Sequence, residues 1–532
     1  MAQGYYALML HAHLPFVRHP ERDYFLEENW LFEAITETYL PLLQMFERLT
    51  REGVPFRLTM SITPPLVNML QDSLLQYRYK RHMEKLIELA EKEKARTRDG
   101  REKIMANLYH RRFSTALDYY LHDINMDMIA RFREFQERGV LDIVTCSATH
   151  TFLPLVKRQE TIKAQLATAR DCHRRAFGVN PVGIWLAECG FYPPLAPLLH
   201  QTGLVYFFAE AATFDTSDPQ AVYGVHAPVT CREAPVAAFA RDMEASSQVW
   251  HAKIGYPGDF AYREFYRDIG FDLDFDYIKP YIDPEGIRIN TGIKYKSITG
   301  PTEDKQAYNP FTAIERASQH ADHFLSNRIA QIQHLSRNMD RPPLVVTPFD
   351  AELFGHWWYE GPLFLEFLIK KMHYNQDVVA MVTPADYLER YPVNQQVSLP
   401  YSSWGEKGYA DFWLSEPNAW IYQHLHTMED RMVEMAVNHR GAQGTLARAL
   451  NQCMRELFLA QSSDWAFIMR NATSVQYAER RTKNHINRFN TLYEQVKHGT
   501  IDEAYLAELA SRDNIFPDID FHWFLPEFQL HG

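Results

Sequence analysis

Short apolar runs alternate with stretches of helical spacing over the first three quarters of the chain. Apolar residues recur at helical intervals in residues 30–49 and 126–138, each time next to such a run. An apolar strand followed by a helix at this rhythm predicts a parallel α/β sheet, either open or closed into a barrel. The runs expected to form strands are residues 5–10, 56–62, 141–146, 182–185, 205–208, 344–349 and 379–382.

Two segments depart from this rhythm. Residues 76–112 are crowded with Lys, Arg and Glu, which predicts a solvated helical pair inserted into the sheet domain. This insertion is either a charged surface excursion or a lid. Residues 223–248 are rich in Gly, Pro, Ala and Ser, and predict a long mobile loop, which in a compact domain is usually functional.

The pattern breaks again at residues 391–403, which contain Pro392 and Pro400. We expect the domain boundary here, between a sheet domain of residues 1–395 and a helical domain of residues 396–532. Two apolar stripes at helical spacing support the second domain. They are Ile421, Leu425, Met428, Met432 and Met435, and Leu446, Leu450, Cys453 and Leu457.

Charge and cysteine content narrow the classes of partner. The net charge of −12 argues against nucleic acid or an anionic membrane, because both attract basic surfaces, whereas a neutral polymer is compatible with it. The five cysteines lie far apart and include no CxxC pair, which favours a reducing compartment. The N-terminus has no basic stretch followed by an apolar signal, so a cytoplasmic location is expected.

Three histidines follow predicted strands. His11 and His13 stand two residues apart, so their side chains point the same way on a strand, and His150 follows another strand. The pair can bind a metal, form hydrogen bonds with substrate hydroxyls, or lie satisfied in the core. A metal site lacks a third ligand at a diagnostic spacing, such as an HExxH sequence.

Two carboxylates also follow apolar strands. Glu188 ends the run Gly183-Ile184-Trp185-Leu186-Ala187, and Asp350 ends another, with Glu352, His356 and two Trp directly after it. A charge in such surroundings is costly unless it has partners or a task. Glycosidases need two carboxylates facing each other across a sugar cleft. A separation of about 5–5.5 Å gives retention and a wider gap gives inversion, and sequence leaves this choice open.

These segments together resemble glycoside hydrolase family 57. The matching stretches are His-x-His-x-Pro at residues 11–15, Trp-Leu-Ala-Glu-Cys at 185–189 and Phe-Asp-x-Glu-x-x-Gly-His-Trp at 349–357. Further matches resemble one branch of the family, the 1,4-α-glucan branching enzymes, and cover the chain nearly end to end. They lie at residues 255–259, 262–270, 403–406, 418–420 and 462–465.

The resemblance implies a (β/α)7 barrel with a small helical insertion and an all-helical C-terminal domain. It implies a retaining mechanism with Glu188 as nucleophile and Asp350 as general acid/base, no metal or organic cofactor, and an α-1,4-glucan polymer such as amylose, amylopectin or glycogen as partner. Trp404 and Trp413 are expected to form a platform for the acceptor chain. The positions that match glucan contacts are His11, His13, Trp30, His150, Arg263, Trp404, Trp413 and Asp464.

The chain departs from this branch of the family at one position that affects how well water competes with the acceptor. Branching enzymes that this chain resembles carry a Tyr on a loop over the active site, where it favours transfer over hydrolysis. The corresponding residues 223–233 have Thr230 or Cys231 at the expected tip. Without that Tyr, water competes better for the glucosyl-enzyme. The enzyme is then expected to branch weakly, or to act mainly as a hydrolase. Glu210 is a further acid after a strand, with no assigned role.

Three alternatives stay open beside a branching enzyme. The first is an α-amylase-like hydrolase on the same scaffold, which new reducing ends distinguish from new α-1,6 linkages. The second is a metal-dependent polysaccharide deacetylase, suggested by His11, His13 and nearby acids, which metal analysis distinguishes. The third is a glucan-binding protein without catalysis, which predicts no change when Glu188 becomes Gln.

Overall fold

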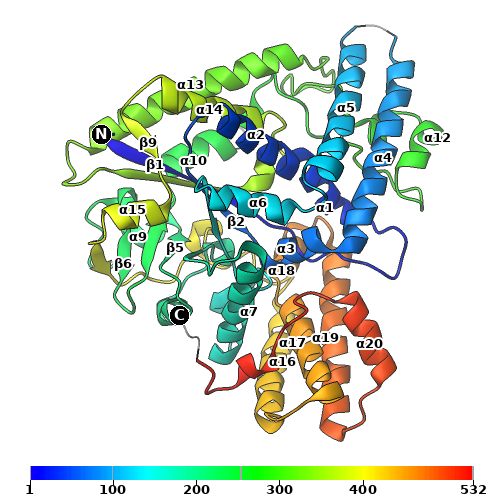
Figure 1. Ribbon diagram of the computed structural model, residues 1–532, viewed down its shortest axis with the longest axis vertical. Helices are drawn as coiled ribbons and strands as arrows, with labels where there is room; N and C mark the ends of the chain where they lie inside the picture. The colour runs from blue at the N-terminus through cyan, green and yellow to red at the C-terminus, as the bar shows by residue number, and fades with distance from the viewer. Residues whose placement is uncertain (1, 99, 252–253, 530–532) are drawn as a thin grey trace.

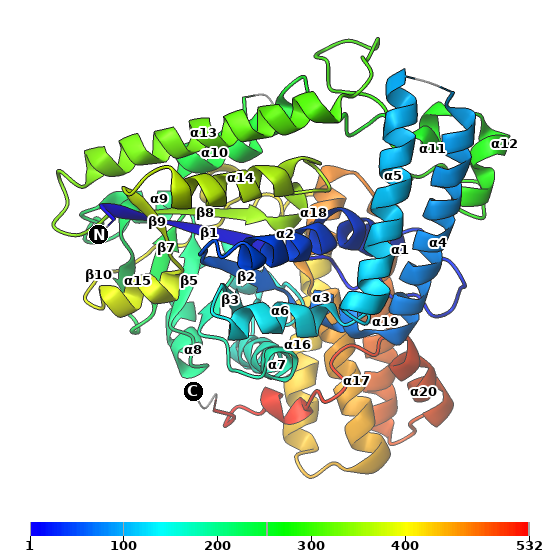
Figure 2. The same ribbon diagram turned by 45° about the horizontal axis from the view of Figure 1, so that its top comes forward.

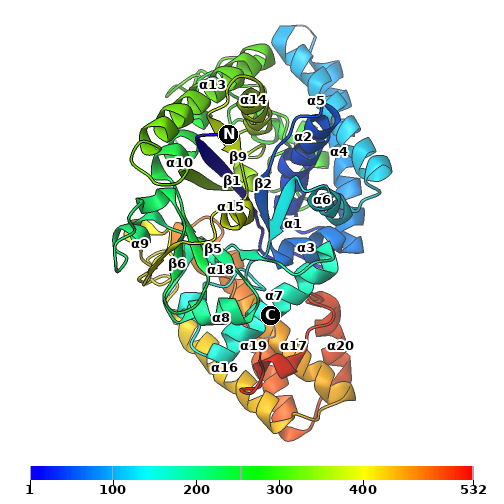
Figure 3. The same cartoon turned by 60° about the vertical axis from the view of Figure 1, so that its left-hand side comes forward.

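A closed barrel of parallel strands forms the centre of the molecule. The structure, a computed structural model, describes residues 2–98, 100–251 and 254–529. Strand β1 pairs in parallel with β2 and β8, and the ladders β2–β3, β4–β5 and β5–β7 continue the sheet (Figure 3). The strands are β1 (Gly4–Ala12), β2 (Leu58–Ile62), β3 (Leu141–Val144), β4 (Gly183–Ile184), β5 (Tyr206–Ala209), β7 (Ala237–Ala240) and β8 (Leu344–Asp350).

Hydrogen bonds between backbone groups complete the circle at two places. The amide of Trp185 donates to the carbonyl of Thr145 over 2.9 Å and joins β3 to β4. The amide of Asp242 donates to the carbonyl of Val346 over 2.8 Å and joins β7 to β8. The strand order is therefore β1-β2-β3-β4-β5-β7-β8, which confirms the expected (β/α)7 barrel. Short strand β9 (Val379–Met381) pairs in parallel with the first residues of β1.

Amphipathic helices cover the outside of the barrel (Figure 2). Helix α2 (Leu40–Arg51) is typical, because it buries Leu42, Leu43, Phe46 and Leu49 at helical spacing toward the strands. The other covering helices are α6 (Met128–Glu137), α7 (Gln159–Phe177), α8 (Leu195–Gln201), α10 (Met243–Trp250), α13 (Pro310–Leu335), α14 (Gly361–Tyr374) and α15 (Pro384–Arg390).

The charged insertion is a helical hairpin, as expected. Helices α4 (Ser73–Arg96) and α5 (Gly100–Asp118) pack side by side and project from the barrel at the top of Figure 1. Glu93 of α4 is fully buried and accepts hydrogen bonds from Tyr277 and Tyr295, and from Arg96 on its own helix. The two tyrosine bonds attach the hairpin to residues 275–295, the segment that begins with α12 (Phe275–Ile278).

The prediction of a long mobile loop at residues 223–248 is wrong. This segment contains β6 (Val229–Cys231), β7 of the barrel and α10. Strand β6 pairs antiparallel with the start of β7 and parallel with β10 (Gln395–Val397). Three of the alanines that suggested a loop, Ala237, Ala238 and Ala240, are buried in β7.

The C-terminal region is all-helical, as expected, and docks below the barrel in Figure 1. Arg481 is a buried link between the two parts, because its Nη2 donates to the carbonyl of Phe16 over 3.0 Å. No helix in the described ranges is long and apolar enough to cross a membrane. The C-terminal helices are α16 (Trp420–Asn438), α17 (Gly444–Ala460), α18 (Ser463–Asn471), α19 (Val475–His498) and α20 (Glu503–Arg512).

Gly355 is a position at which the fold tolerates no side chain. Its φ is +120°, and a Cβ would lie 1.9 Å from the carbonyl oxygen of Glu37. We expect Gly355→Ala to lower the free energy of unfolding by about 3 kcal/mol, because strain and overlap add. Gly441→Ala is the matched control, since a Cβ there meets nothing within 4 Å. Thermal unfolding measures both, and equal midpoints would contradict the packing described.

Candidate active site

Polar side chains gather where the parallel strands end. His11 on β1 lies directly opposite Asp350 on β8 in the ladder, near the carboxyl ends of both strands. His150 follows β3 and Glu188 follows β4. In parallel barrels the carboxyl ends of the strands form one face, so residues distant in sequence share a site.

Glu188 is held in an unusual backbone conformation by residues from outside the barrel. Its φ is 61° and that of Cys189 is 52°, in the left-handed region that side chains other than glycine rarely occupy. Its Oε2 accepts from the Trp404 indole over 2.7 Å, and its Oε1 accepts from the Ser463 hydroxyl over 3.1 Å. The amide of Trp404 also donates to the Glu188 carbonyl over 2.9 Å. The linker and the helical domain therefore orient this carboxylate.

Burial raises the pKa values of both candidate carboxylates. That of Glu188 rises to about 7, with the charges of Asp464 and Asp350 adding to burial and the Trp404 bond opposing it. That of Asp350 rises to about 6, with His13 and Arg241 opposing burial. The Asp350 side chain is nevertheless exposed, although the strand before it is buried. It is therefore surrounded by protein atoms but still open to cleft water.

A chain of neutral histidines ends at Glu188. Because Ser463 donates to Glu188, its oxygen accepts from Nδ1 of His150 over 2.9 Å. Nε2 of His150 then accepts from Nε2 of His11 over 3.0 Å, and Nδ1 of His11 accepts from Ser61 over 3.2 Å. Burial lowers the pKa values of His11 and His150 well below 6.5, which keeps both rings uncharged. The predicted histidines are thus brought together as one network.

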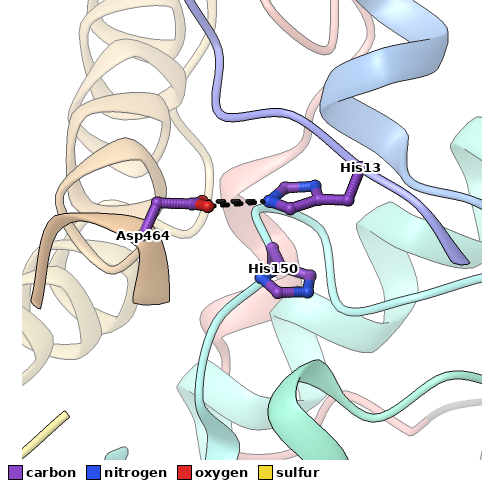
Figure 4. Close-up of side chains that lie close together, drawn as sticks. All are labelled: His13, His150 and Asp464. Carbon is purple, nitrogen blue, oxygen red and sulfur yellow. Dashed lines mark hydrogen bonds and ion pairs between the residues drawn. The ribbon is translucent and has the colours of Figure 1, made fainter. Parts of the chain in front are cut away.

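His13 connects the barrel to the helical domain through Asp464 of α18 (Figure 4). Its Nε2 lies 3.0 Å and 3.1 Å from the two carboxylate oxygens, and its ring stacks on His150 with centroids 3.7 Å apart. Burial lowers the pKa of His13, but the charge and hydrogen bond of Asp464, together with the charges of Glu352 and Glu188, outweigh burial and the net shift is upward. Burial raises the pKa of Asp464, but His13 and Ser462 hold it well below its usual range.

His13, His150 and Asp464 also have the donor atoms of a metal site. One ligand atom from each lies within 4.8 Å of the others. Imidazole and carboxylate groups are zinc ligands, so the chemistry fits. These atoms are, however, already bonded to one another, to Ser463 and to His11. His11, which suggested a metal pair in the sequence, lies outside the cluster.

Two residues in the site had no role assigned from sequence. Glu352 accepts hydrogen bonds from the Tyr39 hydroxyl and from the amide of His13, and burial raises its pKa to about 7. Ser463 bridges His150 and Glu188. The motif around Asp350 gave a signal for Glu352. The matching stretch 462–465 included Ser463 but did not indicate its hydrogen bond to Glu188.

The residues expected to contact the glucan differ in how deeply they are buried and in what they pack against. Trp30 is half-buried, and its ring centroid lies 5.8 Å from that of Tyr477 in an edge-to-face arrangement. Arg263 is buried, with Nη2 3.3 Å from Oε1 of Glu37. Trp413 is only 1% exposed and stacks on Phe152 at 4.7 Å. Trp413 therefore presents no free ring face for the expected acceptor platform, because Phe152 occupies it.

Thr230 and Cys231, at the tip of the expected loop, lie in β6. Thr230 pairs with Ala237 at the amino end of β7. The ring of Tyr223 lies 5.9 Å from Arg341, which precedes β8. This segment is therefore at the amino ends of the strands, whereas Glu188 and Asp350 lie at the carboxyl ends.

Comparison with known proteins identifies the family. The model of glycosyl hydrolase family 57 matches residues 7–400, and that of the 1,4-α-glucan branching enzyme C-terminal domain matches residues 424–524. A curated 1,4-α-glucan branching enzyme of Thermococcus kodakarensis is 33% identical over 97% of this chain and 77% of its own length.

Two solved structures superpose along almost the whole chain. The α-amylase AmyC of Thermotoga maritima is 46% identical, with a TM-score of 0.92 and 99% of both chains covered. The branching enzyme of Pyrococcus horikoshii is 31% identical, with a TM-score of 0.89 and coverage of 99% of this chain and 97% of its own. The chain therefore belongs to glycosyl hydrolase family 57.

Proposed function

We propose that this protein is a retaining 1,4-α-glucan branching enzyme that contributes to glycogen-type glucan synthesis. The main supporting observation concerns the helical domain, which matches the branching-enzyme C-terminal family. Its Ser463 hydroxyl donates a hydrogen bond to the Glu188 carboxylate. The substrate is an α-1,4-glucan polymer such as amylose, amylopectin or glycogen. The five free cysteines support a reducing compartment, and we assign the enzyme to the cytoplasm.

Glu188 is the nucleophile and Asp350 the general acid/base. Glu188 attacks the anomeric carbon while Asp350 protonates the departing glycosidic oxygen, which leaves a covalent glucosyl-enzyme. Asp350 then takes the proton from a 6-hydroxyl of an acceptor chain as that oxygen attacks the same carbon from the other face. The second inversion restores the α configuration and creates an α-1,6 branch.

This division of roles requires Glu188 ionised and Asp350 protonated. The pKa values of about 7 and about 6 mean that near neutral pH the pair shares one proton. Two donated hydrogen bonds favour charge on Glu188, whereas no described side chain donates a hydrogen bond to Asp350. A glucan chain in the cleft displaces water from the exposed Asp350 side chain and raises its pKa further.

Hydrolysis is the second candidate function. AmyC, at 46% identity, is described as an α-amylase. Residues 223–233, where the Tyr is expected, lie at the opposite end of the barrel from Glu188 and do not bear on this choice. Transfer requires that an acceptor hydroxyl reach the glucosyl-enzyme before water does. Glu188 is only 9% exposed, and half-buried Trp404 lies against its carboxylate. This burial shields the nucleophile itself, whereas water and an acceptor hydroxyl both approach from the opposite face, so the products decide between transfer and hydrolysis.

Incubation with amylose tests the proposed activity. We expect many new α-1,6 linkages, counted as chains released by debranching, and few new reducing ends before debranching. Mostly reducing ends would establish the hydrolase instead. Glu188→Gln is expected to lose nearly all of either activity, because the amide is a poor nucleophile. Unchanged product formation by that variant would overturn both candidates.

Trp404→Phe tests the hydrogen bond to Glu188. Loss of the indole donor removes a bond that lowers the pKa of Glu188. The active form needs Glu188 ionised and Asp350 protonated, and with pKa values of about 7 and about 6 this is the minor form of the pair. A higher pKa of Glu188 should therefore move the alkaline limb of kcat/KM to higher pH by about one to two units and lower the maximum, because a bond to a charged group is worth about 1.5–3 kcal/mol. The acid limb should move less. Trp250→Phe, at an exposed indole, is the control. Identical alkaline limbs would exclude the bond.

A further inference from the structure

A group of aromatic rings stands exposed on the surface near the active site. Trp357 is 55% and Tyr266 is 79% exposed. Phe265 lies between them, with its ring centroid 4.7 Å from that of Trp357 at an interplanar angle of 26° and 5.1 Å from that of Tyr266. We call these three residues the rim platform. Exposed aromatic groups of this kind mark binding surfaces more often than they stabilise a fold.

Charged side chains beneath the rim platform hold it in place. Nζ of Lys294 lies 4.5 Å from the Phe265 ring and donates to the Phe265 carbonyl. The His356 ring packs at 5.5 Å against Phe265 and at 5.2 Å against Trp357. Nδ1 of His356 donates to Oε2 of Glu37 over 2.7 Å. The rings are therefore preorganised, which lowers the entropy lost when a ligand binds.

The rim platform is continuous with the active site through one helical segment. The π-helix η1 (Ile35–Tyr39) carries Tyr39, which bonds Glu352, and Glu37, which bonds His356. Trp357 itself lies seven residues after Asp350 on the chain that leaves β8. The rim platform therefore lies on the same end of the barrel as Asp350, the end at which β8 finishes.

Hydrogen-bonding groups line a small cavity beside the rim platform. It is bounded by Glu33, Glu37, Lys294, His356 and Asn290, among others. Glu33 lies one helical turn from half-buried Trp30 on α1 (Glu28–Ala34). Flat apolar rings beside polar groups match a pyranose unit, which has apolar faces and a rim of hydroxyls.

We propose that the rim platform is an outlying glucan-binding subsite, on which a glucosyl unit remote from the reacting bond stacks. The proposal rests on the proposed function, since the ligand is the same α-1,4-glucan. A chain of a few units held at the catalytic pair does not extend to the platform, whereas a polymer does. The subsite therefore makes the enzyme select long chains.

The double variant Trp357→Ala/Tyr266→Ala tests the subsite by two measurements. Retardation in native gels that contain amylose reports binding, and cleavage of a short maltooligosaccharide reports the catalytic centre. We expect about tenfold weaker binding of amylose, with the rate on the short substrate unchanged within twofold. Tyr374→Ala is the matched control, because Tyr374 is 63% exposed at the end of α14.

Each other result has a definite meaning. Unchanged retardation by amylose overturns the subsite, and so does an equal loss on short and long substrates with an unchanged unfolding temperature. If the double variant unfolds early, Tyr266→Ala alone repeats the test, since a side chain 79% exposed contributes little to folding. Wild-type protein that neither binds amylose nor cleaves the short substrate would instead refute the proposed function.

Discussion

The Glu188 carboxylate is fixed by three parts of the chain at once, and the arrangement of the site depends on this. The barrel supplies the residue in a left-handed backbone conformation, the linker supplies the Trp404 indole, and the helical domain supplies the Ser463 hydroxyl. An isolated barrel would leave this buried charge without its two donors, which costs more than the bonds themselves gain. The helical domain is therefore part of the active site and not an attachment to it.

The same constraint explains the histidine network. His11 and His150 stay neutral because burial penalises their charged forms. Each neutral ring accepts one hydrogen bond and donates one, so the bonds run in a single direction from Ser61 to Ser463. His13 has a different task, because the Asp464 carboxylate favours its charged form. The charged His13, together with Arg241, then offsets part of the negative charge around Asp350 and Glu188.

Hydrophobic and charge patterns along the sequence predicted the elements of the fold that such short-range patterns determine. Apolar runs located the barrel strands, the charged repeat located the α4–α5 hairpin, and the strand ends pointed to Glu188 and Asp350. The same method failed at β7, where alanines imitate a loop, and at Trp413, whose burial against Phe152 is a tertiary contact. The role of Ser463 was equally invisible, since it lies 275 residues from Glu188 in sequence.

Trapping of the covalent intermediate tests the central claim most directly. An α-maltosyl fluoride donor needs no acid to release fluoride, so in Asp350→Asn the first step should proceed and the second should stall. Mass spectrometry of the digested protein should then find one maltosyl group on the peptide that contains Glu188. A label on Glu352, or release of β-configured sugar without any label, would contradict the assignment of Glu188 as nucleophile.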